Sequence, residues 1–331
     1  MKHVSILVPN SPCILSSVIG AYKVFTTVNM TLASQGKRPF FKIQMLGISN
    51  ETPLYDGLFV VRPDVLLNDA AKTDLVVIPA IQGDMPTSLK LNAPYIPFII
   101  DQYKQGAEIA SLCTGAFLLA STGLLKGKKI STHWIAADAF RQAFPDVKLQ
   151  PEKIITDELG MYSSGGAYSF LNLMIYLVEK FCGREMAVYC SKVLEIEIER
   201  KSQSPFAIFT GQKTHEDEPI KKAQLFMENN VNSKVSVEQL SEMFAISRRN
   251  FERRFKKATS NTPVEYLQRV KIEAAKKSLE SSRENINEVM YAVGYSDSKA
   301  FRTMFKKITG LSPVNYRNKY NREMAVSLVS S

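Results

Sequence analysis

The last third of this 331-residue chain contains an internal repeat, which limits the possible fold more than any other feature of the sequence. Residues 251–266 and 301–316 carry the same aromatic, basic and proline residues at one constant offset. The matching positions are Phe251, Phe255, Lys256, Lys257, Thr259, Pro263, Val264 and Tyr266 in the first copy, and Phe301, Phe305, Lys306, Lys307, Thr309, Pro313, Val314 and Tyr316 in the second. Self-similarity at a fixed offset predicts that one small structural unit occurs twice.

Each copy has the pattern of two short helices joined by a tight turn. In the first copy, apolar residues at helical spacing end near Phe244 and resume at Phe251, after a break at residues 245–247. In the second copy, Gly294 lies at the break, where glycine adopts a positive φ at no steric cost. Two helices with a short turn match the helix-turn-helix plan, in which the second helix enters the major groove of DNA.

The polar side chains of each second helix are suited to contact base edges and phosphate oxygens. In the first copy they are Arg248, Arg249, Asn250, Glu252, Arg253 and Lys256, and in the second Ser298, Lys299, Arg302, Thr303 and Lys306. One basic helix face is more often merely solvated, but two at the same register favour contact with DNA. For Glu252 two roles stay open, because it can accept from a cytosine or pair with a neighbouring arginine.

The distribution of charge supports a nucleic-acid-binding module without reference to any motif. Residues 219–331 hold 21 Lys and Arg against 11 Asp and Glu, whereas residues 1–218 hold 21 of each. The whole net charge of +10 therefore lies in the last third of the chain. A basic module attached to a neutral domain is the electrostatic footprint of nucleic-acid binding.

Residues 219–318 resemble the AraC/XylS-type DNA-binding domain, which has two helix-turn-helix units joined by a helix. The resemblance rests on Gly294-Tyr295-Ser296-Asp297, Phe301, Phe305-Lys306 and Gly310-Leu311-Ser312-Pro313. It implies binding to double-stranded promoter DNA. The joining helix is expected at residues 264–279.

Residues 1–182 alternate short apolar runs with helical patterns, which predicts an α/β domain with a mainly parallel sheet in three layers. The expected strands are 4–8, 41–46, 75–78 and 107–112, and the expected helices are 18–32, 95–104, 114–125 and 135–144. Ligands bind such sheets at the carboxyl ends of the strands.

A strand that runs through Cys113 directly into a helix is the sharpest feature at that edge. Such an elbow places the residue at its tip in the pocket, and the helix amino terminus is expected to lower the pKa of the thiol. His133 follows another expected strand. From the residues alone, Cys113 is more often an inert buried thiol, and His133 more often a structural histidine.

Further side chains are candidates for the same ligand pocket because they lie at strand ends or helix starts. They are Asn10, Tyr22, Gly83, Thr114, Trp134, Ser164 and Gly165. The glycine pair at 165–166 precedes a helix whose amino terminus suits an anion, although a simple turn explains it equally well. Trp134 is the only tryptophan and is suited to stack on a quaternary ammonium or a planar group, or to fill the core. No cysteine spacing indicates a disulfide framework or a metal site, and no cofactor is expected.

Residues 3–180 are similar to the PfpI-type, class I glutamine amidotransferase-like fold, and their run from Cys113 to Trp134 resembles the sensor half of GlxA-type regulators. In that resemblance, Cys113 and His133 occupy the nucleophile and histidine positions. Relatives carry a glutamate on the first helix where this chain has Lys23. A lysine cannot act as the carboxylate partner of the thiol, so we expect a pocket that binds without catalysis.

The sequence thus predicts a transcription regulator with a ligand-sensing domain at 1–182, a helical extension and linker at 183–218, and a DNA-binding domain at 219–320. The family resemblance implies a nitrogen-containing effector such as an amino acid derivative or a betaine, a homodimer, contact with RNA polymerase, and activation rather than repression. With no signal segment and no apolar run near ~20 residues, a cytoplasmic location without membrane contact is expected. Two alternatives stay open: a cysteine-dependent amidase fused to a DNA-binding domain, and a redox-responsive regulator that uses Cys113.

Overall fold

The computed structural model describes residues 1–198, 200 and 202–321. The chain divides into two compact units, Met1–Gln203 and Ser204–Ser331, and each is described by itself. Residues 183–203 thus lie with the first unit and residues 204–218 with the second.

The first unit is built on one seven-stranded sheet. Its strands, in sheet order, are β10 (Ile155–Glu158), β11 (Met161–Ser164), β7 (Glu108–Leu112), β6 (Leu75–Ile78), β1 (Lys2–Leu7), β2 (Phe41–Gly47) and β5 (Val65–Leu66). All neighbouring pairs are parallel except β10 and β11, which are antiparallel. Two short pairs lie outside the sheet: the hairpin β3 (Thr52–Leu54) with β4 (Phe59–Val61), and β8 (Lys129–Ile130) with β9 (Lys148–Leu149).

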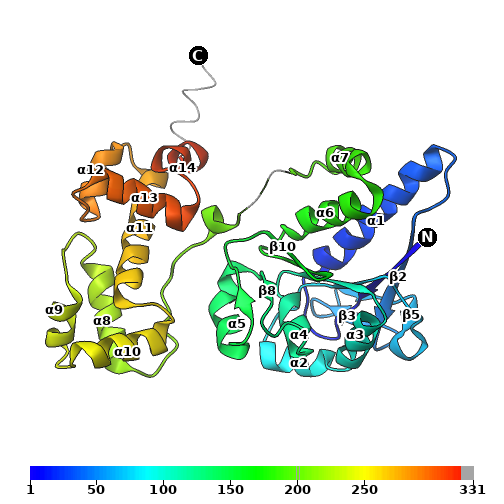
Figure 1. Cartoon of the computed structure of the whole chain (residues 1–331), viewed down its shortest axis with the longest axis horizontal. Helices are drawn as coiled ribbons and strands as arrows, with labels where there is room; N and C mark the ends of the chain where they lie inside the picture. Colours follow the sequence, from blue (N-terminus) through cyan, green and yellow to red (C-terminus); the bar gives the residue numbers. More distant parts are fainter. Residues whose placement is uncertain (199, 201, 322–331) are drawn as a thin grey trace, which may run out of the picture. The chain divides into compact units, whose positions relative to one another are not determined.

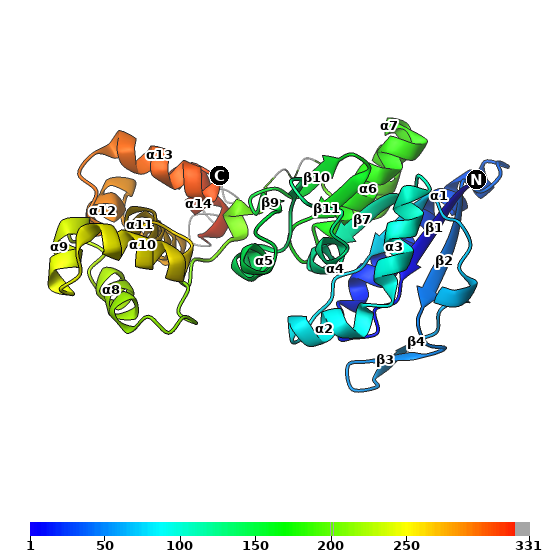
Figure 2. The same ribbon diagram turned by 60° about the horizontal axis from the view of Figure 1, so that its bottom comes forward.

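Helices cover both faces of this sheet, as Figures 1 and 2 show. One face carries α1 (Leu15–Ser34), α6 (Phe170–Cys182) and α7 (Arg184–Val193), and the other carries α2 (Met85–Asn92), α3 (Tyr95–Lys104), α4 (Gly115–Ser121) and α5 (Ala137–Ala143). Strand β6 shows why the sheet must be covered twice. Leu75 and Val77 pack into the core under α1 and α6, whereas Val76 and Ile78 pack into the core under α3 and α4.

The predicted α/β class and mainly parallel sheet are confirmed, and β6 and α3 have the expected bounds. The helix expected after the glycine pair at 165–166 begins at Phe170, and Gly183 separates it from a second helix. Gly183 has a φ of +87°, which ends α6 and starts α7 in a new direction.

The second unit is all-helical. Its helices are α8 (Glu218–Asn229), α9 (Val237–Met243), α10 (Arg248–Thr259), α11 (Pro263–Ser281), α12 (Ile286–Ala292), α13 (Ser298–Thr309) and α14 (Pro313–Tyr320). The two repeats form two small cores, one around Phe251 and Phe255 and the other around Phe301 and Phe305. All four rings are fully buried.

The tight turns of the two helix-turn-helix units are made by different residues. The first turn uses Ala245 with a φ of +52°, and the second uses Gly294 with a φ of +73°. Pro263 and Pro313 start α11 and α14, where the missing amide hydrogen of proline costs no helical hydrogen bond.

The segment before α8 packs on the second unit as a strap, which we define as residues 204–217. The ring of Phe209 meets that of Tyr266 edge-on, with 5.1 Å between centroids. The Nζ of Lys276 donates to the carbonyl of Ala207 at 2.6 Å. Gly211 lies so close to Tyr266 that a Cβ there would be 2.2 Å from the phenolic oxygen. The strap is therefore part of the helical unit.

Of the helices in the described part of the chain, none combines the length and the apolar character that crossing a bilayer requires.

Candidate functional sites

Cys113 lies at the tip of a strained elbow between β7 and α4, as the sequence predicts. Its φ of +54° is unusual for a residue with a side chain and marks a constrained turn. The backbone N–H of Cys113 donates to the carbonyl oxygen and the hydroxyl of Ser164, at 3.0 and 3.2 Å. The Thr132 hydroxyl donates to the carbonyl of Cys113 at 3.0 Å. Hydrogen bonds from two neighbouring segments thus hold the elbow in place.

The expectation that the helix amino terminus lowers the pKa of Cys113 is wrong. The side chain is only 1% exposed, and burial raises the pKa of the thiol to about 11. Hydrogen bonds with Thr114 and His133 oppose this rise but do not cancel it. Lys23 lies on the exposed side of α1 and is not among the groups that shift this pKa. At neutral pH the thiol is protonated and a poor nucleophile.

His133 and Trp134 lie beside the elbow on the loop that follows β8. The N–H of Ile135 donates to Nδ1 of His133 at 3.1 Å, so the neutral imidazole carries its proton on Nε2. Burial lowers the pKa of His133, which favours this neutral form. The Trp134 ring is tilted against the imidazole, with 5.5 Å between centroids. The pair offers two N–H donors, Nε2 of His133 and Nε1 of Trp134, and two half-buried aromatic faces.

Gln203 also belongs to this site, although sequence reasoning missed it. Its side chain is buried, and its amide nitrogen donates to the carbonyl of Thr132 at 2.8 Å. Its amide oxygen accepts from the N–H of Trp134 at 3.3 Å. A Cβ on Gly165 would lie 2.1 Å from the amide nitrogen, so glycine at 165 makes room for Gln203.

The other candidates for the ligand pocket are Thr114, Gly83, Asn10 and Tyr22, and they lie in different surroundings. The hydroxyl of Thr114 donates to Ile81 in the loop after β6, at 2.6 Å. Gly83 lies in the same loop, against Pro12, with a φ of +82°. The N–H of Asn10 donates to the side chain of Asn92 at 2.8 Å. Tyr22 lies on the solvent side of α1 with 43% of its surface exposed, and no hydrogen bond or ring contact in the described residues joins it to Cys113.

In the second unit, α10 and α13 present matching stripes of polar side chains. The stripe on α10 consists of Arg249, Glu252, Arg253 and Lys256, and the stripe on α13 consists of Lys299, Arg302, Thr303 and Lys306. All are exposed or half-exposed, at the same helical spacing and at the same offset as the buried phenylalanines. The α10 stripe lines a groove that Val237, Thr262, Pro263 and Val264 complete. Four of the predicted residues on each second helix therefore share one face, whereas Arg248, Asn250 and Ser298 lie outside the two stripes.

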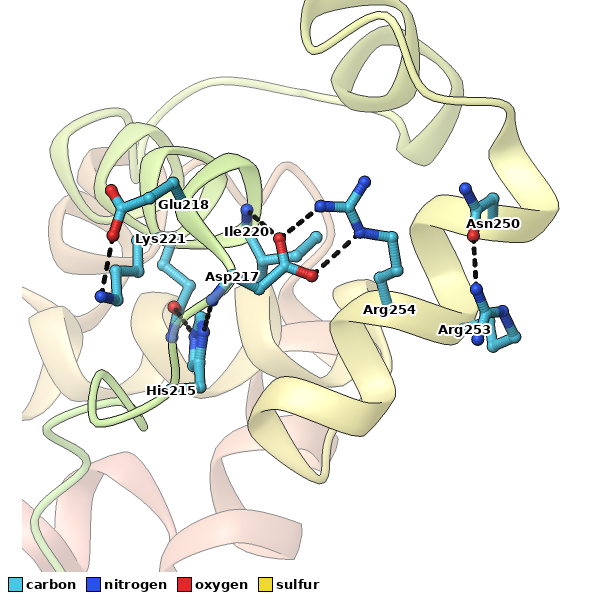
Figure 3. A network of polar contacts seen from close by, with 9 residues as sticks. His215, Asp217, Glu218, Ile220, Lys221, Asn250, Arg253 and Arg254 are labelled. Carbon is cyan, nitrogen blue, oxygen red and sulfur yellow. Dashed lines mark hydrogen bonds and ion pairs between the residues drawn. The ribbon is translucent and has the colours of Figure 1, made fainter.

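Some predicted DNA-contacting residues already have partners within the unit. Arg248 pairs with Glu238 and, at 3.1 Å from its Nε, with Glu252. The guanidinium of Arg253 donates to the side-chain oxygen of Asn250 at 2.8 Å (Figure 3). Of the two open roles for Glu252, pairing with a neighbouring arginine is the one seen in the unbound protein. Ser298 begins α13 and is half-exposed.

Arg254 faces away from this stripe and fixes the start of α8. Its guanidinium forms two hydrogen bonds with the Asp217 carboxylate, at 2.9 and 2.6 Å (Figure 3). The same carboxylate caps α8 by accepting from the N–H of Ile220. The hydrogen bonds from Arg254 are the main cause that lowers the pKa of Asp217.

We expect Asp217→Ala to destabilise the helical unit by about 1 kcal/mol at pH 7, because it removes a helix cap and a two-point ion pair. Since the pKa of Asp217 is lowered by folding, this contribution is present above the unfolded pKa of about 4 and is lost as the pH falls through the folded pKa. Thermal unfolding of the wild type and of Asp217→Ala measures this difference in stability, which should be smaller near pH 3 than at pH 7. Glu218→Ala, which breaks the neighbouring exposed pair with Lys221, is the matched control and should change little.

The two helix-turn-helix units are tied together by a lysine of the joining helix α11. The Nζ of Lys271 donates to the carbonyl of Ser233, before α9, and to the carbonyl of Val293, in the second turn, at 3.2 and 3.1 Å. Lys271 is 7% exposed, and burial lowers its pKa. One buried amine therefore links the two units.

Among the described residues, no group of three His, Cys, Asp or Glu side chains is arranged to hold a metal ion.

Comparison with known proteins agrees with both parts of this description. Residues 41–180 match the DJ-1/PfpI family, and residues 240–319 match a helix-turn-helix domain family. A structure from Vibrio parahaemolyticus, of a protein proposed to be a transcriptional regulator, matches with a TM-score of 0.52 at 25% identity, over 58% of this chain and 98% of that one. A ThiJ/PfpI family protein from Pseudomonas syringae matches with a TM-score of 0.50 at 16% identity, over 69% of this chain and 86% of that one, which bears on the fold alone.

Similar curated proteins include several regulators. The HTH-type transcriptional regulator GbdR of Pseudomonas aeruginosa is 26% identical over 79% of this chain and 70% of its own length. The HTH-type transcriptional regulator GlxA of Rhizobium meliloti is 23% identical over 65% of this chain and 66% of its own. An isonitrile hydratase of Pseudomonas putida also matches, 24% identical over 44% of this chain and 60% of its own.

The fold and the paired recognition helices define a helix-turn-helix transcription regulator with an α/β domain of the DJ-1/PfpI type. Within that class, the chain is similar to the regulators GbdR and GlxA, over 79% and 65% of its length.

Proposed function

We propose that the α/β unit binds a small metabolite beside Cys113 and that this binding changes how the helical unit binds promoter DNA. The effector acts through its different affinity for two arrangements of the protein. The observation that carries the DNA-binding part is the pair of matching stripes on α10 and α13. As a transcription regulator, the protein is expected to act in the cytoplasm, as a homodimer that contacts RNA polymerase and activates transcription.

The Cys113 site is proposed to bind without catalysis. The buried, protonated thiol and the absence of a glutamate at Lys23 both argue against a nucleophile at neutral pH. The same burial argues against Cys113 as an oxidant sensor, since oxidation requires an accessible thiolate. From the resemblance to regulators of this kind, we infer an amino acid derivative or a betaine as the effector, bound by His133 and by Trp134.

The effector proposal is tested by thermal shift of the full chain with amino acids, amino acid amides, betaines and polyamines. A ligand at one hundred times its Kd should stabilise the first unit by about 2.7 kcal/mol. The hit should persist in Cys113→Ser, and it should change the affinity for DNA selected by the protein from a random-sequence pool. Recovery of a chemically altered ligand, with loss of that change in Cys113→Ser, would instead establish an enzyme.

The two kinds of DNA contact are expected to respond differently to mutation. Arg253→Ala should reduce the free energy of binding to the selected sequence by about 1 to 3 kcal/mol and relax the preference at one base pair, because an arginine on a base edge carries sequence information. Lys256→Ala should weaken binding to all sequences alike and make the affinity less dependent on salt. Fluorescence anisotropy with the selected site and single-base variants separates these outcomes. Identical behaviour of the two variants would mean that the reading face is assigned wrongly.

A further inference from the structure

Gln203 is a polar side chain held inside the proposed effector site by the site's own polar groups. It is 1% exposed. Three acceptors surround its amide nitrogen: the carbonyl of Thr132 at 2.8 Å, the carbonyl of Lys153 at 3.3 Å and the hydroxyl of Ser131 at 3.4 Å. The N–H of Trp134 faces its amide oxygen. We call these four groups the amide cradle.

The donor and acceptor pattern of the amide cradle selects one kind of head group. A primary carboxamide supplies two N–H donors, which the three acceptors share, and a carbonyl oxygen that accepts from the N–H of Trp134. A carboxylate would place its lone pairs against the carbonyl of Thr132, which costs free energy. A quaternary ammonium has no N–H to donate. The cradle therefore fits –CONH₂ better than either of these groups.

A second, independent feature is a buried polar group beside the amide cradle that Gln203 leaves without a hydrogen bond. The hydroxyl of Ser169 is fully buried and lacks a hydrogen-bond partner in the described structure. It lies beside Gly166, next to the same amide oxygen: a Cβ on Gly166 would be 2.7 Å from the hydroxyl and 3.7 Å from Oε1 of Gln203. An unpaired buried hydroxyl costs free energy, and a ligand with one more polar atom than Gln203 would recover it.

We propose that Gln203 is a built-in competitor for the effector, and that the effector carries a primary carboxamide which takes its place in the amide cradle. This inference rests on the proposed sensing function and narrows its ligand class to amides. A tethered competitor reduces the apparent affinity of the free ligand by the fraction of time the cradle is empty.

Displacement of Gln203 also supplies a way to transmit binding along the chain. Gln203 ends the first unit, and Ser204 begins the strap of the second. The side chain of Gln203 shares the holding of this segment with hydrogen bonds from Ser202 and Gln203 to the carbonyl of Glu152 and with a bridge between Ser202 and Lys153. When the amide leaves the cradle, this anchor weakens and the connection between the units lengthens.

The test uses the full chain with propanamide, which has the head group of glutamine, and follows its melting temperature and its binding by saturation-transfer NMR. Gln203→Ala opens the cradle and should bind propanamide at least about tenfold more tightly than the wild type. Gln105→Ala, the same change on the exposed end of α3, is the matched control and should behave as the wild type. Propanoate and N,N-dimethylpropanamide should not bind any of the three proteins.

A second variant keeps the test informative if Gln203→Ala folds poorly. Gln203→Glu keeps the length of the side chain but is repelled by the carbonyls of Thr132 and Lys153, so it too should open the cradle to propanamide. Equal binding by wild type and both variants, or binding of N,N-dimethylpropanamide as good as that of propanamide, overturns the proposal. An effector found by the metabolite screen that is not an amide would overturn this inference while leaving the sensing function intact. If propanamide binds as expected but no metabolite changes DNA binding, the amide cradle stands and the sensing function is overturned.

Discussion

Gly294→Ala is expected to destabilise the helical unit by about 2 to 5 kcal/mol. A left-handed backbone costs a residue with a side chain about 1 to 2 kcal/mol, and overpacking costs about 1 to 3 more. At Gly294 both apply, because φ is +73° and the added Cβ would lie 2.5 Å from the carbonyl oxygen of Asn232 and 2.6 Å from Nζ of Lys271. The clash pushes apart the groups that link the two helix-turn-helix units.

The matched control is Gly127→Ala, which has the same φ of +73° but open space around the added Cβ. Gly127→Ala should destabilise the α/β unit only by the cost of a left-handed backbone, about 1 to 2 kcal/mol. Thermal unfolding gives both values, and anisotropy with the selected DNA should show a loss of affinity for Gly294→Ala alone. Equal destabilisation by the two variants would mean that the close approach to Lys271 has no energetic weight.

Phe255→Ala is expected to destabilise the helical unit by about 3 to 5 kcal/mol. The ring is fully buried and contacts two others: Phe251 on the same helix, with centroids 5.6 Å apart, and Tyr266 on α11, with centroids 5.3 Å apart. Removing it leaves a cavity between the recognition helix and the joining helix, so α10 loses its fixed position.

The control for this change is Phe206→Ala, since Phe206 is 39% exposed and the amine of Lys319 lies over its ring, 4.8 Å from the centroid. Phe255→Ala should lower the unfolding temperature of the helical unit sharply and abolish tight DNA binding, whereas Phe206→Ala should leave both nearly unchanged. A small effect of Phe255→Ala on unfolding would contradict the assignment of a separate core to the first repeat.

Sequence reasoning succeeded where the structural signal was periodic or local. The repeated phenylalanines predicted two helix-turn-helix units, and both rings of each pair are buried as expected. The apolar run at 75–78 predicted a central strand, and the run at 107–112, followed at once by a helical pattern, predicted the elbow at Cys113. In each case neighbouring residues alone decide the conformation.

The parts that were missed depend on residues far apart in the chain. Gln203 lies 71 positions from Thr132, its main hydrogen-bond partner, and no periodicity marks it. The pKa of Cys113 was predicted in the wrong direction because a helix end is visible in the sequence, whereas the depth of burial is not. The pairing of Arg248 with Glu238 likewise depends on how two helices pack.

The strap at 204–217 determines where a DNA-binding fragment of this protein should begin. A DNA-binding fragment that starts at α8 would lose the ring that covers Tyr266, the carbonyl that accepts from Lys276, and the Asp217 partner of Arg254. A fragment that starts at Ser204 keeps all three. A chimeric regulator that joins a different sensor domain to this DNA-binding unit should therefore be fused before the strap, at Gln203, where the α/β unit ends.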